Sequence, residues 1–589
     1  MTSSGDDGSR RLWLAGLGAL AAVALRYIGQ AWDDPTVPPG LALALFAFVL
    51  THAIVAMTLT GPLPALRALT GALWLSLPLT ALICWAGHRF DAATDLADDP
   101  ATIVVAVLLV SIVTPFLLVR LSAPGHWRDP ARLFDAAWTM HVRFLAAWLF
   151  VGTVWVALFL SDTLLSLVDV TLIRALMRHE SFAFGLSGAA LGLGLAVTWE
   201  LRATVSPFLA LRLLRLLIPL ALVVVVGFLL ALPFRGFSGL FSEFSAATTL
   251  MGVALVGLTL IACALDRDDA DAVTSPLLRW STRGLAASLL LIAALAFWSV
   301  SLRVSQHGWT PDRLLAAVSA ALLMAYGISY FLAAVQAGWM ARIRSANVGL
   351  ALLVAAVAAL WFTPVLNPQR IAAESQVARY LSGKTSLSRL ALWELAHDWG
   401  RAGNAALERL SAVDDRADHA ELMTRIADVR AQTSRFRFDK LLRDRAMPRA
   451  EWSERIAARI TVVPQGRVDA RMFAALDADQ LERISRGCMR NLPDGRPGCA
   501  MVRGRFAGAN EEAMILFLAE AGVVWVQHMV ISDGVALDLQ QVTQVGKSET
   551  PFPRLWPKDL AAVLDGNYAI RPTGLNALWI GERGLQPSN

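Results

Sequence analysis

Lysine is almost absent from this sequence, and charge of either sign is scarce. The 589 residues include only four lysines, at positions 384, 440, 547 and 558. Charged residues make up 17% of the chain, against about 25% in ordinary soluble domains. The mean hydropathy is +0.53. The arginines are scattered and form no basic arm or basic-aromatic stripe, so we expect no nucleic-acid partner.

Several motifs that would reveal an activity are also missing. The sequence has no phosphate-binding Walker loop, no Rossmann fingerprint, no His-Glu-x-x-His and no Gly-x-Ser-x-Gly. We therefore expect no cofactor and no metal. The sequence leaves open whether the chain is an enzyme and favours a role without catalysis.

What the sequence does contain is a series of long apolar segments. A bilayer core about 30 Å thick needs roughly 20 apolar residues per helix. The sequence therefore predicts a polytopic α-helical membrane protein with about eleven transmembrane helices. The candidate segments are 12–27, 40–59, 68–85, 101–119, 144–165, 182–199, 216–232, 246–265, 285–302, 314–335 and 348–364.

The arginines predict an orientation, because cytoplasmic loops carry an excess of Lys and Arg. With a cytoplasmic N-terminus, fifteen arginines fall in inside loops and seven in outside loops. An odd number of spans then places the C-terminal part outside the cytoplasm. The first span follows Arg10 and Arg11, and we interpret it as an uncleaved signal anchor.

A change of composition near Pro368 divides the chain into parts. Residues 1–367 form the predicted multipass transmembrane domain, and residues 368–460 form a helical extracytoplasmic segment. Residues 461–589 are predicted to form a soluble α+β domain with a small, mostly antiparallel sheet. The strand-like segments there are 460–464, 499–506, 513–518, 523–531 and 536–545, and 475–485 is helical.

The four cysteines fall into two groups. Cys84 and Cys263 lie in predicted spans, whereas Cys488 and Cys499 flank a run rich in turn-forming residues. In an oxidising compartment the second pair forms a disulfide, which stabilises by about 2–3 kcal/mol. In a reducing compartment two free thiols remain, and no nearby residue completes a zinc site. The predicted outside location favours the disulfide.

The loop 306–313 (QHGWTPDR) resembles a signature of the bacterial multipass family called domain of unknown function 4153. That family has an aromatic residue where His307 stands. The turn 399–403 (WGRAG) and the strand region around the Cys488–Cys499 pair are also similar. The resemblance implies a fold and a location in the bacterial envelope. Combined with the orientation predicted from the arginines, this indicates the inner (plasma) membrane with a periplasmic C-terminal domain. It implies no activity and no catalytic residues.

The same loop has a structural and a functional interpretation. Thr310 is suited to cap the following helix, with Pro311 in its first turn. Alternatively, Arg303, His307 and Arg313 form an outer-face site for a lipid phosphate or another anion, because Arg binds phosphate bidentately.

A second candidate is the acidic pair Asp33 and Asp34, after the first span. Membrane transferases that use polyprenyl-linked sugars have an acidic residue in the first outer loop, where it acts as a base or metal ligand. This loop is far shorter than theirs, and Asp-Asp-Pro is common in turns.

The resulting interpretation is an envelope protein with a binding, assembly or lipid-handling role, whose partners are the bilayer and a lipid or envelope protein. The alternatives are a polyprenyl-dependent glycosyl or headgroup transferase with an outer-face site, and a transporter. A transferase needs a wet cavity at the acidic pair or the Arg303 cluster, and a transporter needs a polar pocket near the middle of the membrane.

Overall fold

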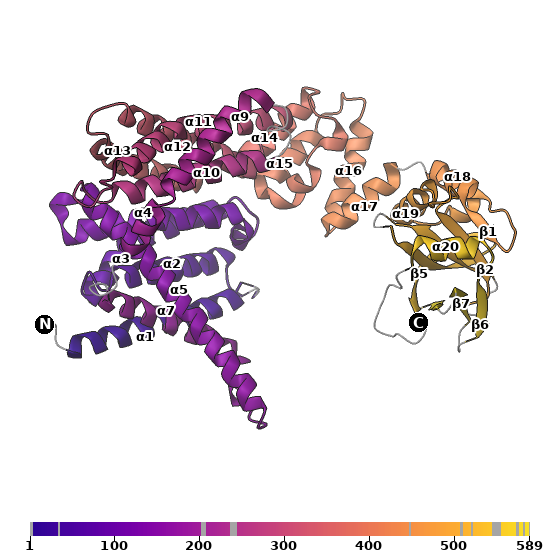
Figure 1. Ribbon diagram of the computed structural model, residues 1–589, viewed down its shortest axis with the longest axis horizontal. Helices are drawn as coiled ribbons and strands as arrows, with labels where there is room; N and C mark the ends of the chain where they lie inside the picture. The colour runs from indigo at the N-terminus through magenta and orange to yellow at the C-terminus, as the bar shows by residue number, and fades with distance from the viewer. Residues whose placement is uncertain are drawn as a thin grey trace. The chain divides into compact units, whose positions relative to one another are not determined.

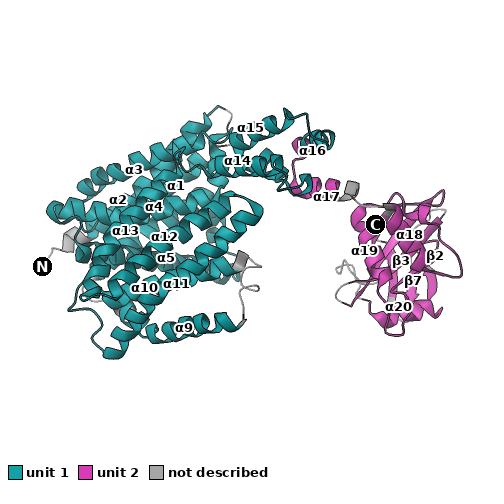
Figure 2. Ribbon diagram, turned by 90° about the horizontal axis from the view of Figure 1, so that it is seen from above, with its two compact units in different colours: residues 1–426 teal, residues 427–589 magenta. Residues whose placement is uncertain are grey.

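The computed structural model describes the chain from residue 4 to residue 587 with short gaps (Figure 1). It forms two compact units, Met1–Ile426 and Ala427–Asn589 (Figure 2). The described ranges are 4–32, 34, 36–201, 208–235, 244–446, 449–506, 511–519, 522–544, 555–572, 576–580 and 583–587.

The first unit is a bundle of helices. Within the described ranges, eleven helices are long and apolar enough to cross a membrane, which agrees with the number predicted from sequence. One of them, Leu211–Phe234, is formed by α8 (Phe208–Arg215) and α9 (Ile218–Arg235) together. The others are α1 (Ser4–Gln30), α2 (Pro39–Leu59), α3 (Ala65–Gly87), α4 (Pro100–Ser122), α5 (Pro130–Ser166), α7 (Glu180–Glu200), α10 (Phe244–Leu265), α11 (Pro276–His307), α12 (Pro311–Ala334) and α13 (Trp339–Trp361). The short α6 (Leu172–Met177) lies between α5 and α7 in sequence.

Several spans begin with a capping side chain followed by proline. Asp99 accepts a hydrogen bond from the backbone N–H of Ala101 at 3.1 Å, and Asp129 accepts one from Ala131 at 3.0 Å. Proline suits the first helical position because the N–H that it lacks would have no partner there. These caps fix the starts of α4 and α5.

Arginine side chains close the opposite ends of several spans. The last carbonyl groups of a helix have no partner within it. Arg143 on α5 is 5% exposed and donates to the carbonyl oxygens of Thr58, Thr60 and Leu195, each at 3.2 Å. Similar contacts join Arg67 to Leu121, Arg283 to Ala334 and Arg344 to Leu265. A guanidinium presents five donors in a fork and can therefore serve several carbonyls at once, which the point charge of lysine does less well.

Helix α1 lies against α7 through small residues. A Cβ added to Gly18 would lie 2.8 Å from the carbonyl carbon of Gly188, so the two backbones are in direct contact. Such close approach is typical of glycine-mediated helix pairs in membranes. The helix ends are joined by the ion pairs Arg11–Glu200 and Arg26–Glu180. Helix α1 is therefore an integral part of the bundle.

The first unit continues beyond the last span. Helix α14 (Pro368–Leu381) is capped by Asn367, whose side chain accepts from the backbone N–H of Arg370 at 3.1 Å. It contacts α12 and α15 (Gly400–Ser411), and α16 (His419–Ala431) reaches the boundary between the units. The change of composition at Pro368 and the boundary after Ile426 are thus different points of the chain.

The second unit contains an eight-stranded sheet with the order β1-β2-β3-β4-β5-β8-β7-β6. The pairing of β1 with β2 is parallel, and the other described pairings are antiparallel. The strands predicted from sequence coincide with β1 to β5. The strands are β1 (Thr461–Val463), β2 (Cys499–Gly504), β3 (Glu511–Leu518), β4 (Val524–Ser532), β5 (Val535–Gln544), β6 (Ala569–Pro572), β7 (Asn576–Ile580) and β8 (Arg583–Pro587), and the helices are α17 (Arg435–Ala446), α18 (Arg449–Arg459), α19 (Ala478–Met489) and α20 (Pro557–Leu564).

Both faces of this sheet are buried. On β3, Ile515 faces a core shared with α18 and α19, while its neighbour Leu516 faces a second core shared with α20 and β7. Successive side chains of a strand point to opposite faces, so burial on both sides requires a continuous apolar run. This explains why β3 reads as an uninterrupted hydrophobic segment.

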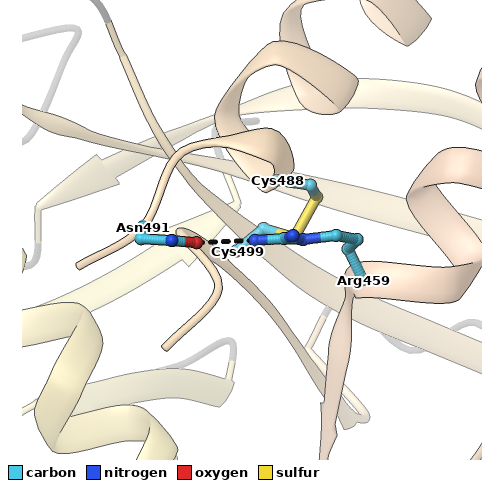
Figure 3. Close-up of a disulfide and its surroundings, with 4 residues drawn as sticks. All are labelled: Arg459, Cys488, Asn491 and Cys499. Atoms are coloured by element: carbon cyan, nitrogen blue, oxygen red, sulfur yellow. Dashed lines mark hydrogen bonds between the residues drawn. A yellow bond between two sulfur atoms is a disulfide. The ribbon is translucent and has the colours of Figure 1, made fainter. Parts of the chain in front are cut away.

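Cys488, in the last turn of α19, forms a disulfide with Cys499 at the start of β2 (Figure 3). Both residues are fully buried in the core under α19. The predicted pairing is confirmed. Beside it, the guanidinium of Arg459 donates to Asn491 Oδ1 at 2.6 Å, within the loop that the disulfide closes.

Candidate functional site

The structure brings Arg303, His307 and Arg313 together at the end of α11. Arg379 from α14 and Arg389 lie close enough to add their charges to the electrostatic environment of His307. Five basic side chains therefore gather where a span ends. The sequence pointed to three of them, because the other two come from a segment more than 60 residues further along the chain.

Much of this cluster holds the end of α11 in place. Arg313 donates to the carbonyl oxygen of Gly308 at 3.0 Å, and Arg379 donates to that of Ser305 at 3.0 Å. Gln376 on α14 donates to the carbonyl oxygens of His307 at 3.1 Å and of Trp309 at 3.0 Å. These donors satisfy helix-end carbonyls that would otherwise lack partners.

The helix cap predicted for the same loop is confirmed. Thr310 Oγ1 accepts from the backbone N–H of Arg313 at 3.3 Å, and Pro311 is the first residue of α12. An anion-binding role for Arg303, His307 and Arg313 stays a prediction.

Asp34 is engaged locally. Its Oδ1 accepts from the hydroxyl of Thr36 at 2.7 Å and from the backbone N–H of the same residue at 2.9 Å, and these bonds lower the pKa of Asp34. This is the turn chemistry expected for Asp in such a sequence. Asp33 lies outside the described residues.

The largest of the four described cavities lies elsewhere in the first unit. It has a volume of about 460 Å³ and is lined by residues from α3, α14, α15 and the loops that follow α3 and α13. We call it the basic cavity, because its lining includes His88, Arg89, Arg370, Arg401 and Arg409. The remaining lining residues are Trp85, Phe362, Pro364, Asn367, Ala373, Glu374, Ala402 and Ala405.

Arg89 organises the floor of the basic cavity. Its side chain is 8% exposed. It donates to the carbonyl oxygen of Trp361, the last residue of α13, and to that of Thr363, in the loop after α13, at 3.2 Å. It also reaches Gln369 Oε1 on α14 at 3.5 Å. Burial lowers the pKa of Arg89 to about 10, partly opposed by the charge of Asp99. Arg89 therefore stays charged at neutral pH.

The backbone of Arg89 holds the opposite wall. Its carbonyl oxygen accepts from the backbone N–H of Arg401 at 2.9 Å, at the start of α15. Gly400 precedes it with a positive φ of 49°, and a Cβ there would lie 2.5 Å from the same oxygen. Only glycine meets both conditions without strain.

The basic side chains above this floor are exposed. Arg370 donates to the carbonyl oxygen of Pro364 at 3.0 Å, and Arg401 Nε lies 3.5 Å from Asp91 Oδ1. Arg409 is exposed in the last turn of α15. The sequence gives no local signal for the role of Arg89, because the residues 361–370 that it contacts lie more than 270 positions further along the chain.

A second cavity, of about 320 Å³, lies between α4, α5 and α13. Its walls are mostly apolar, with Ser111, His141 and Asn347 among the polar lining residues. Tyr330 donates to Asn347 Oδ1 at 2.8 Å. Pro115 in α4 lines the same space. The mostly apolar lining of this cavity differs from the polar pocket that a transporter would need.

In the second unit, Glu512 and His528 form a fully buried pair. Their side chains are 0% exposed, and His528 Nε2 lies 3.3 Å from Glu512 Oε2. The carboxylate also accepts from the backbone N–H of Phe506, and His528 Nδ1 lies 3.3 Å from Gln540 Oε1. The pair is hydrogen-bonded on both sides, as buried polar groups require.

The fold is predominantly helical, and its first unit contributes eleven helices long and apolar enough to cross a membrane within the described ranges. Comparison with family models, with curated proteins and with solved structures finds no match. The functional argument therefore rests on the chain's own geometry.

Proposed function

We propose that this protein binds the phosphate-bearing headgroup of a membrane lipid in the basic cavity. The observation that carries the proposal is where the cavity lies. Trp85 is in the last turns of α3, and Phe362 directly follows the last residue of α13. The cavity therefore opens where two apolar spans end, at the depth of lipid headgroups, where Trp is typically found.

The charge of the lining suits a phosphate. Arg370 and Arg409 are exposed to the cavity, and the buried Arg89 adds a positive charge behind them. Guanidinium groups bind phosphate oxygens bidentately, and basic pockets between membrane helices are typical lipid headgroup sites.

This cavity supports the lipid-handling role better than the transferase. A transferase based on the predicted acidic pair needs a carboxylate of that pair in a cavity and free to act as a base. Asp34 is hydrogen-bonded to Thr36 and does not line any of the four described cavities.

The proposal is tested with the full chain purified in nanodiscs that contain phosphatidylglycerol in a phosphatidylcholine background. Retained phosphatidylglycerol is counted by native mass spectrometry for the wild type, for the double variant Arg370→Ala/Arg409→Ala, and for Arg430→Ala. Arg430 is a matched control, since it is also exposed in the last turn of a helix, α16, and does not line the cavity.

We expect the double variant to lose about fivefold or more of the retained lipid, since each charged contact contributes up to about 1 kcal/mol at an exposed site. Arg430→Ala should behave as the wild type. Equal retention by all three proteins would refute lipid binding in this cavity.

We further propose that the chain lies in a bacterial inner membrane with its N-terminus in the cytoplasm and its C-terminal domain in the periplasm. Support comes from the excess of arginine in the predicted inside loops and from the Cys488–Cys499 disulfide, which suits an oxidising compartment. Membership of the family domain of unknown function 4153 is likewise a proposal, based on the loop 306–313.

A further inference from the structure

The basic cavity also contains a carboxylate. Glu374 lies on α14, one turn after Arg370, and its side chain is exposed. Within the described part of the chain, no ion pair of Glu374 is found. The neighbouring Asp91 differs, because it pairs with Arg401 at 3.5 Å. Glu374 is thus the acidic group of the cavity whose charge is available to a ligand.

A carboxylate is unfavourable in a site for a purely anionic ligand. Placed beside Arg370 and Arg409, Glu374 repels a phosphate group and weakens its binding. The same charge becomes favourable when the ligand carries a cation next to its phosphate. A cavity lined by two exposed arginines and one exposed carboxylate therefore matches a dipolar ligand.

We infer that the basic cavity takes a zwitterionic phosphoethanolamine headgroup, with the phosphate at Arg370 and Arg409 and the ammonium at Glu374. This inference depends on the lipid-binding function proposed above. The cavity volume of about 460 Å³ is in the range of small-ligand sites.

The chemistry of the lining favours a primary ammonium over a trimethylammonium. A primary ammonium has three N–H donors for the carboxylate of Glu374. Trimethylammonium groups have no such donor and are usually held in cages of several aromatic rings. The cavity offers Trp85 and Phe362, and the second is only 1% exposed.

A competition experiment tests this inference in the full-length protein. Nanodiscs contain phosphatidylethanolamine and phosphatidylglycerol with the same acyl chains, in equal amounts, in a phosphatidylcholine background. The ratio of the two retained lipids is measured by native mass spectrometry for the wild type, Glu374→Gln and Glu408→Gln. Glu408 is the control, because it is exposed on α15 next to Arg409 in sequence and does not line the cavity.

The wild type and Glu408→Gln should retain phosphatidylethanolamine about three- to fivefold over phosphatidylglycerol, the range of one exposed ion pair. Glu374→Gln should bring the ratio close to one without loss of phosphatidylglycerol. An equal ratio in the wild type, or a ratio that Glu374→Gln leaves unchanged, would overturn the inference.

The two proposals fail in different ways. If Arg370→Ala/Arg409→Ala retains both lipids as the wild type does, lipid binding in the cavity is wrong. If that variant loses both lipids while Glu374→Gln leaves the ratio unchanged, only the headgroup assignment is wrong. Glycerophosphoethanolamine, the soluble headgroup without chains, should bind far more weakly than the lipid; equal affinity would overturn the assignment to a membrane lipid.

Discussion

The contact between α1 and α7 allows a sharp test of the packing described here, with a matched pair of substitutions. Gly16 and Gly18 are two residues apart on α1. Gly18 is buried against Gly188, whereas nothing lies within 4 Å of a Cβ added to Gly16. Changing either glycine to alanine favours the helix to the same extent, by up to about 1 kcal/mol. A difference between the two variants therefore reports packing alone.

The size of the expected effect follows from the geometry. A Cβ at position 18 would lie 2.8 Å from the carbonyl carbon of Gly188, while ordinary contacts begin at 3.4 Å. The helices must separate by at least 0.6 Å, the difference between these two distances. Separation of about 0.5–1 Å loses a quarter to a half of each dispersion contact. Overpacking of this kind costs about 1–3 kcal/mol.

The assay uses the chain's own free cysteines. Cys84 and Cys263 lie inside spans, so a thiol-reactive fluorogenic dye reports the unfolding of the bundle during heating in detergent. Gly18→Ala should melt about 2–6 °C below Gly16→Ala. If the two variants melt together, the close contact between α1 and α7 is wrong. A melting temperature of Gly16→Ala below that of the wild type would show instead that the exposed face of α1 has a partner.

Three further outcomes are expected. Arg143→Lys should destabilise the bundle by about 2–4 kcal/mol, because lysine leaves backbone carbonyls without donors. The thermal unfolding assay with the thiol-reactive dye measures this loss, and Arg120→Lys, at an exposed position, should leave the melting temperature unchanged. Replacing Cys488 and Cys499 with serine should lower the free energy of unfolding of the second unit by about 2–3 kcal/mol, measured by denaturant titration. In the wild-type protein, non-reducing mass spectrometry should find the two cysteine-containing peptides linked. A reporter active only in the periplasm, fused after Asn589, should be active; an inactive reporter would reverse the proposed orientation.

The spans could be predicted from the sequence because membrane helices depend on local composition. A run of about 20 apolar residues is sufficient evidence for a spanning helix, whatever the helix contacts. The strands β1 to β5 were predicted for a similar reason, since buried β3 reads as a continuous apolar segment. The strands β6 to β8 are each four or five residues long, and their place in the sheet depends on pairing that the sequence does not reveal.

The basic cavity could not be predicted, because its parts come from distant segments. Arg89, Arg370 and Arg409 are separated by hundreds of residues or by whole helices, and none stands in a motif. Arg303, His307 and Arg313 were found because they lie close together in sequence, at the end of α11 and the start of α12. Local patterns thus revealed some of the residues at this helix end, whereas the cavity arises only when α14 and α15 return to the ends of α3 and α13.

The arginines that clamp helix ends bear directly on the proposed orientation. An arginine that donates to the carbonyls of a helix end is required there by hydrogen bonding, on either side of the membrane, and so carries less information about the cytoplasmic side. Within the described part of the chain, at least six of the arginines assigned to inside loops donate to such carbonyls or to the loop that follows a span, and at least two of the outside ones do. Setting these aside leaves nine inside and five outside. The excess of arginine in the inside loops keeps its sign and nearly its ratio, so these helix-end contacts do not create it. The proposed periplasmic placement of the second unit therefore retains its electrostatic basis.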